Sequence, residues 1–192
     1  MFDPTKFITE HTRLQYLDFV PEIKLFLRED NNLKFLLKKE GIDIYPSWAY
    51  SWAGGQGLAR YILDNDIVRG KTVVDYCSGS GIVGIAAKMA GAKQVICIDN
   101  DPLSFEAVRL NCEANGVEVI TSADNHDADI ILAGDPALQR PIFDYLKSKN
   151  AYVGCPVRIP ELVTGFDSIC TYQISTFAYI DSDTEPTVHV FR

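Results

Sequence analysis

From residue 72 onward, short apolar runs alternate with segments whose apolar positions recur at the spacing of a helix. The apolar runs are bounded by turn residues and predict strands at 72–76, 94–99, 117–122, 128–135 and 151–155. The segments between them predict helices at 81–92, 101–116 and 137–149. Because apolar strands separated by helices form a parallel sheet with both faces covered, this pattern predicts a doubly wound α/β domain.

The end of the chain breaks the alternation. Residues 168–180 and 184–192 are both rich in β-branched and aromatic residues, and the polar stretch between them is too short for a helix. Two strands joined by so short a turn pair in antiparallel fashion. We therefore expect a mostly parallel sheet of about seven strands from Thr72 onward, closed by an antiparallel strand pair.

The first seventy residues follow no such alternation. Their patterns predict a weak helix, a strand and a second helix, at 5–17, 22–29 and 31–39. Since no linker rich in Gly, Ser or Pro interrupts the chain, we expect one domain over 1–192, with an N-terminal extension and pre-sheet helix over 1–70 and a core over 71–192. The first forty residues can be a structural cap on one sheet edge, a lid or a partner-binding face.

Composition narrows the classes of function. The net charge is −8 and no basic patch is readable, so nucleic acid is not expected as a partner. The 5 cysteines are scattered, as in reduced cytoplasmic proteins, and the 3 distant histidines offer little for a metal site. We read no signal peptide and no apolar run of ~20 residues, so no membrane partner is expected. We expect a monomer or weak homo-oligomer in the cytoplasm.

The strongest chemical signal is the segment Gly-Ser-Gly-Ile-Val-Gly at residues 79–84, which follows a strand and opens a helix. Its spacing matches the fingerprint of dinucleotide-binding proteins, which seat a diphosphate on the helix start. Asp75, however, stands four residues ahead of Gly79 at the strand tip, where a carboxylate would repel a diphosphate. A cationic, phosphate-free nucleoside such as S-adenosylmethionine suits this charge better, with the acid addressing its amino-acid end.

Three polar residues after the next two strands complete a nucleoside site. Asp99 can accept both ribose hydroxyls, Asn100 would lie beside the adenine, and Asp124 is a partner for the exocyclic amine. Each acid alone can equally be a strand-end, turn or capping residue, and a lone glycine fingerprint is often only a turn. Their joint occurrence with the glycines favours a methyl donor over a nicotinamide cofactor, which stays the alternative.

The chain resembles the class I S-adenosylmethionine-dependent methyltransferases. Within them it is similar to the group of the electron-transfer-flavoprotein β-subunit lysine methyltransferase, often labelled nicotinamide N-methyltransferase-like. The segments that carry the resemblance are HTRL, VPEIKLFL, WAYSWAGGQGLARYILDN, VRGKTVVDYCSGSG, IDNDP and AGD. The resemblance implies a Rossmann-like methyltransferase fold, with S-adenosyl-L-methionine as cofactor and S-adenosyl-L-homocysteine as product.

By this resemblance Trp52 lines the cofactor pocket, although Trp48 and Trp52 can equally be core residues, and Gly54 to Gln56 a loop that leads into a helix. The implied cofactor site further comprises the glycine loop, the ribose ligand and the Ala-Gly-Asp segment, at Asp75, Cys77, Ser78, Gly79, Gly81, Asp99 and Gly134. Three positions depart from the relatives: Cys77 replaces a glycine, Leu138 a tyrosine and Cys155 an acid. The changes at Leu138 and Cys155 lie in the motifs that serve the substrate in the relatives, whereas the cofactor motifs are kept.

Asp135, at the end of a strand beside the donor, is the candidate catalytic residue. A lysine amine, with an unperturbed pKa of ~10.4, must be neutral to attack, and a carboxylate can orient it or take its proton through water. Alternatively Asp135 caps the next helix, because Pro136 follows at once. We expect N-methylation of a protein lysine or another amine; the alternatives are a cofactor-binding interaction protein without catalysis and, last, a nicotinamide-dependent oxidoreductase.

Overall fold

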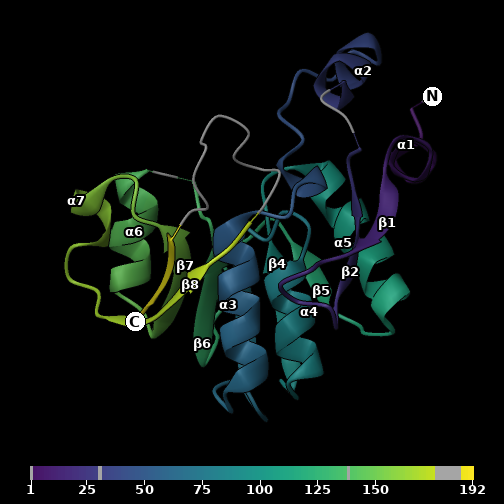
Figure 1. Cartoon of the computed structure of the whole chain (residues 1–192). Helices are drawn as coiled ribbons and strands as arrows, with labels where there is room; N and C mark the ends of the chain where they lie inside the picture. Colours follow the sequence, from purple (N-terminus) through teal and green to yellow (C-terminus); the bar gives the residue numbers. More distant parts are fainter. Residues whose placement is uncertain (1, 30–31, 138, 176–186) are drawn as a thin grey trace.

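The computed structural model describes residues 2–29, 32–137, 139–175 and 187–192, and its centre is a seven-stranded sheet (Figure 1). The strands are β3 (Thr72–Tyr76), β4 (Gln94–Ile98), β5 (Ile120–Ser122), β6 (Ile130–Gly134), β7 (Ala151–Pro156), β8 (Ser168–Gln173) and β9 (Thr187–Phe191). They lie in the order β5-β4-β3-β6-β7-β9-β8. The first five are parallel, and β9 is antiparallel to both β7 and β8. The predicted mostly parallel sheet with a closing antiparallel pair is confirmed.

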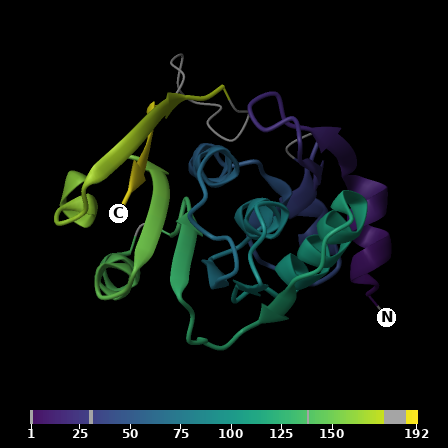
Figure 2. The ribbon, with the colours of Figure 1, turned by 90° about the horizontal axis from the view of Figure 1, so that it is seen from below.

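Helices cover both faces of the sheet, as Figure 2 shows. On one face lie α3 (Ala53–Asp64), α4 (Ile82–Met89) and α5 (Pro102–Asn115), and on the other α6 (Arg140–Lys147) and the short α7 (Pro160–Val163). Neighbouring strand residues alternate between the two cores: Val73 packs with the α3–α5 side and Val74 with the α6–α7 side. This two-sided burial is why the central strands, such as β3 and β6, are almost continuously apolar.

The N-terminal residues form α1 (Pro4–His11), the antiparallel strands β1 (Arg13–Tyr16) and β2 (Lys24–Leu27), α2 (Leu33–Lys39) and the short 3-10 helix η1 (Ser47–Ala49). The β1–β2 hairpin does not extend the central sheet. Leu25 and Leu27 of β2 pack in the same core as Val108 and Cys112 of α5, beside which the hairpin lies (Figure 1). The hairpin therefore covers a helix, whereas the structural-cap interpretation had placed it on a sheet edge.

Most predicted elements are shorter in the structure, and three of them illustrate the difference. The weak helix at 5–17 ends at His11, because the next residues gain backbone partners by pairing with β2. The strand at 117–122 shortens to β5, since the Val117 amide donates to the Cys112 carbonyl and completes the end of α5. The strand at 168–180 ends at Gln173, and residues 176–180 lie outside the described residues.

Glycines let the first half of α3 lie directly against the sheet. A Cβ on Gly54 would stand 2.2 Å from the Gly154 carbonyl oxygen, and one on Gly57 would stand 2.6 Å from Val188 Cγ1. Gly54 and Gln56 are therefore buried helix residues and not a loop leading into one. This close approach sets the start of α3 at the ends of β6 and β7.

Candidate cofactor pocket and active site

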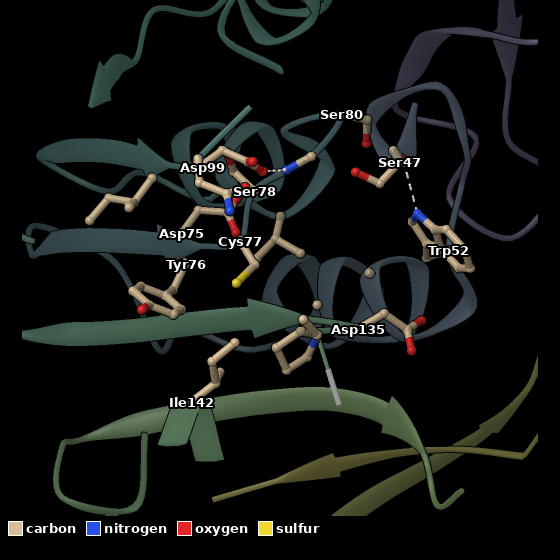
Figure 3. A pocket seen from close by; sticks show the side chains of 18 of the residues that line it. Ser47, Trp52, Asp75, Tyr76, Cys77, Ser78, Ser80, Asp99, Asp135 and Ile142 are labelled. Atoms are coloured by element: carbon tan, nitrogen blue, oxygen red, sulfur yellow. Dashed lines mark hydrogen bonds between the residues drawn. The ribbon is translucent and has the colours of Figure 1, made fainter. Parts of the chain in front are cut away.

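A pocket of about 660 Å³ lies at the carboxyl ends of β3, β4 and β6, beside the start of α3 (Figure 3). This edge is where open α/β sheets bind their ligands. Of the residues predicted from the sequence, the pocket is lined by Trp52, Asp75, Cys77, Ser78, Gly79, Asp99, Asn100, Gly134 and Asp135. The fold thus gathers residues from four separate segments into one site.

The glycine loop owes its shape to left-handed backbone at three positions, Cys77 (φ 60°), Gly79 (φ 49°) and Gly81 (φ 79°). Such angles favour glycine, so Cys77 occupies a position that suits the glycine of the relatives. Its thiol accepts a hydrogen bond from the Ala137 amide, and burial raises the pKa of the thiol to about 12. Gly81 does not line the pocket; it precedes α4, and its amide donates to the Ser78 carbonyl at 2.7 Å.

Asp75 is 1 % exposed at the floor of the pocket. Its Oδ2 accepts a hydrogen bond of 2.8 Å from the Gly84 amide in the first turn of α4. Burial, opposed by that hydrogen bond and reinforced by the nearby Asp99, raises the pKa of Asp75 to about 7. The carboxylate therefore fixes the helix start, while its predicted contact with the amino-acid end of a ligand stays a prediction.

Asp99 follows β4 and holds the glycine loop. Its Oδ2 accepts from the Gly79 amide at 2.8 Å, which Figure 3 marks, and its Oδ1 accepts from the Asp101 amide at 3.0 Å. Asn100 lies beside it in the pocket wall. Asp99, the residue predicted to bind the ribose, is thus held in place next to the glycines.

Asp135 follows β6 with a left-handed backbone (φ 51°). Its Oδ2 accepts a hydrogen bond from the Gly54 amide at the start of α3, and its own amide donates to the Gly154 carbonyl at 2.7 Å. Asp135 therefore caps α3. The alternative interpretation, in which it caps the next helix, is wrong, because that helix, α6, begins at Arg140 with no side-chain cap from Gln139. Trp52, which precedes α3, supplies no cap of its own.

An aromatic stack forms the wall of the pocket near the start of α3. The rings of Tyr45 and Tyr50 lie 5.4 Å apart, and those of Tyr50 and Trp52 lie 5.2 Å apart. The Trp52 Nε1 donates to the Ser47 carbonyl at 2.9 Å. Trp48, in contrast, is fully buried in the core near α1. Of the two tryptophans, only Trp52 lines the pocket.

Sequence reasoning missed part of the pocket wall. The missed polar and aromatic residues are Tyr45, Ser47, Tyr76, Ser80, Asn125, Gln139 and Arg158. Asp124 does not line the pocket, whereas its neighbours Ala123 and Asn125 do, because the Asp124 amide turns back to bond Ser122 Oγ at 3.0 Å. For Arg158 the sequence did offer one signal, because this arginine is retained in the otherwise altered segment Gly-Cys-Pro-Val-Arg.

Charge in this pocket is mainly negative: its lining includes three carboxylates, Asp75, Asp99 and Asp135, and one cation, Arg158. The part of the chain that the structure describes holds no group of three or more His, Cys, Asp or Glu side chains arranged to bind a metal. Within the same residues no helix is both long enough and apolar enough to cross a bilayer.

Comparison with known proteins gives concordant matches. Residues 58–140 match the family model for ribosomal protein L11 methyltransferase (PrmA). The chain is 36% identical over 155 residues to the electron transfer flavoprotein β-subunit lysine methyltransferase of Homo sapiens, covering 66% of this chain and 59% of that protein. It thus spans less than two thirds of that relative's length.

Solved structures share the fold at low sequence identity. A proposed RNA methyltransferase from Pyrococcus horikoshii matches with a TM-score of 0.58 at 20% identity, over 75% of this chain and 86% of its own. The structure of a further proposed methyltransferase, complexed with S-adenosylhomocysteine, matches with a TM-score of 0.54 at 14% identity, over 88% of this chain and 53% of its own.

The strand order, the acid-flanked glycine loop and these matches define the class: the chain has the fold of the class I S-adenosylmethionine-dependent methyltransferases. Within that class its sequence is similar to the electron transfer flavoprotein β-subunit lysine methyltransferases, at 36% to 43% identity in the human and Xenopus laevis proteins. The resemblance read from the sequence is confirmed at both levels.

Proposed function

We propose that this chain binds S-adenosylmethionine in the pocket and uses it to methylate an amine. One observation carries the cofactor assignment: the loop amides that would face a diphosphate already have protein acceptors. The Gly79 amide donates to Asp99, the Gly84 amide to Asp75, and the Gly81 amide to the Ser78 carbonyl. A diphosphate would find carboxylates in place of free donors, whereas a sulfonium and an ammonium would be attracted.

The residues present fit this cofactor. Asp99 can accept from the ribose, and Asp75 and the bare backbone at Gly79 suit the amino-acid end. When bound, S-adenosylmethionine supplies an activated methyl group on a sulfonium. The name of one structural neighbour, complexed with S-adenosylhomocysteine, supports the same assignment.

For the acceptor, we propose a protein lysine, which the names of the similar lysine methyltransferases support. Tyr45 and Trp52, which both stack on Tyr50, form one wall of the pocket, and an apolar wall of this kind favours a neutral amine. Asp135 lines the pocket near Trp52, at the start of α3, where it can orient the amine and take its proton through water. Positioning and exclusion of water are then the main contributions of the chain.

A second candidate is a protein that binds the cofactor without transferring its methyl group. One observation favours it: an oxygen of Asp135 is already engaged by the Gly54 amide as a helix cap. The replacement of the relatives' tyrosine by Leu138, which lies outside the described residues, points the same way.

The cofactor assignment is tested by thermal unfolding with S-adenosylhomocysteine and, separately, with NAD. We expect stabilisation by the first alone, amounting to ~2.7 kcal/mol at a ligand concentration a hundred times its Kd. Stabilisation by NAD and none by S-adenosylhomocysteine would overturn the proposal.

The two candidate functions are separated by incubating the protein with donor carrying a labelled methyl group and a cell lysate, followed by mass spectrometry of labelled proteins. Label on a lysine supports the enzyme, and binding of the donor without label transfer supports the second candidate. We also propose a cytoplasmic monomer or weak homo-oligomer, which cell fractionation and sedimentation of the purified chain would test.

A further inference from the structure

A fully buried asparagine on α5 joins the glycine loop to the N-terminal hairpin. Asn111 is 0 % exposed. Its Nδ2 donates to the Ser80 carbonyl at 2.8 Å, and its Oδ1 accepts from the Phe26 amide of β2 at 2.7 Å. One side-chain amide thus holds two backbone groups that lie 54 residues apart (80 − 26) and belong to different layers of the molecule.

A second asparagine on the same face of α5 makes only half of this connection. Asn115, one turn later, also bonds β2: its Oδ1 accepts from the Lys24 amide at 3.1 Å and its Nδ2 donates to the Lys24 carbonyl at 2.6 Å. Its Nδ2 also donates to the Asn111 carbonyl within the helix. Both residues therefore hold the hairpin on α5, but only Asn111 reaches the glycine loop.

The Ser80 carbonyl, which accepts the hydrogen bond from Asn111, belongs to a peptide group between two glycines of the loop. Ser80 is 3 % exposed and stands between Gly79 and Gly81, both in left-handed backbone. Glycine gives little resistance to rotation of the adjoining peptide planes, so an external partner is needed to fix them. A buried carbonyl without a partner would also cost free energy, and the Asn111 amide removes that cost.

We propose that Asn111 is a positioning residue of the cofactor pocket, through which docking of the β1–β2 hairpin and order in the glycine loop stabilise each other. Figures 1 and 2 show the hairpin on α5, on the side away from the sheet, so it has no direct place in the pocket wall. Its influence passes through the Asn111 side chain. Since coupling of this kind is reciprocal, ligand in the pocket also strengthens hairpin docking. Only the identity of the ligand rests on the proposed function.

The matched pair Asn111→Leu and Asn115→Leu tests this inference without ligand. Both substitutions remove bonds to β2, so both accelerate hydrogen exchange in residues 24–27. We expect only Asn111→Leu to accelerate exchange of the Gly81 amide, by at least about tenfold relative to Asn115→Leu. Equal exchange of the Gly81 amide in the two variants would overturn the inference. Should Asn111→Leu not fold, Asn111→Asp, which keeps the acceptor for Phe26 and removes the donor to Ser80, replaces it.

The second measurement is calorimetric affinity for S-adenosylhomocysteine. We expect Asn111→Leu to raise the Kd at least about tenfold and Asn115→Leu to leave it within about twofold of the wild type. We further expect the ligand to slow exchange of the Phe26 amide in the wild type and in Asn115→Leu, but not in Asn111→Leu. If the wild type does not bind the ligand, the proposed function fails, while exchange of the Gly81 amide still decides the present inference.

Discussion

The Asp135 carboxylate faces the pocket and also caps α3, and one substitution separates these roles. Asp135→Asn keeps an oxygen for the Gly54 amide, and asparagine tolerates the left-handed backbone at φ 51°. We expect the free energy of unfolding to change by less than about 1 kcal/mol. Methyl transfer should fall at least about tenfold, because an amide cannot take a proton. Chemical denaturation and single-turnover methylation measure the two effects.

Asp135→Ala is the control for the cap. It removes the bond to the α3 start and places alanine in left-handed backbone, so we expect a loss of about 1–2 kcal/mol in unfolding free energy. If Asp135→Asn methylated its substrate at the wild-type rate, Asp135 would be a structural cap alone.

Asp75 gives stability a specific pH dependence. Burial raises the pKa of its carboxyl from 3.8 to about 7, so the folded protein binds this proton more tightly than the unfolded chain. The resulting stabilisation is complete below about pH 4 and is lost as the pH rises through 7. Asp75→Asn removes it. We expect the difference in unfolding free energy, wild type minus variant, to increase on acidification by at most on the order of 4 kcal/mol.

Denaturant unfolding of both proteins at several pH values between 4 and 8 measures this difference. Comparing wild type with Asp75→Asn cancels the titration of the carboxylates that lie away from Asp75; Asp99, whose charge acts on Asp75, is the exception. A difference that does not vary with pH would mean that the Asp75 carboxyl keeps its ordinary pKa in the folded protein.

Among the elements, α3 depends on backbone-to-backbone packing against the sheet. A Cβ on Gly54 would lie 2.2 Å from the Gly154 carbonyl oxygen. Because both groups belong to the backbone, neither can move away without distorting α3 or the sheet. We expect Gly54→Ala to lower the unfolding free energy by at least about 2 kcal/mol. Gly55→Ala meets only the Ile82 side chain at 3.0 Å and gains up to ~1 kcal/mol of helix propensity, so its net effect should be within about 1 kcal/mol.

Thermal and denaturant unfolding of the two alanine variants provides the comparison. Because the start of α3 also carries Trp52 and the Asp135 cap, Gly54→Ala should in addition weaken binding of S-adenosylhomocysteine. Equal stability of the two variants would show that α3 can shift on the sheet without cost.

The sequence allowed prediction of those features that depend on residues close together along the chain, such as strand ends and the glycine loop. Asp75 and Asp99 stand at strand ends that hydrophobic alternation identifies, so their place beside the glycines followed at once. The bond from Gly54 to Asp135 joins residues 81 positions apart, and that from Phe26 to Asn111 joins residues 85 apart. No local pattern encodes such pairs. For the same reason β1 was read as helix, since its strand conformation depends on pairing with β2.

The charge of the whole molecule bears on the acceptor. The sequence carries a net charge of −8, and three carboxylates line the pocket. An acidic surface attracts basic partners over distances of about a Debye length, ~10 Å at 0.1 M salt. The acceptor lysine is therefore expected to lie in a basic segment of its protein, and acidic flanks should slow the encounter.

Two peptides with the same acceptor lysine, one flanked by arginines and one by glutamates, test this directly. At low salt we expect kcat/KM to be about tenfold higher for the basic peptide, because steering acts on association. The kcat values should agree, since the flanks lie outside the pocket. Added salt should reduce the ratio of kcat/KM towards one, as the Debye length falls to ~3 Å at 1 M. A ratio that persists at 1 M salt would instead indicate direct contacts to the flanking residues, and an inverted ratio would mean that Arg158 and not the surface charge governs recognition.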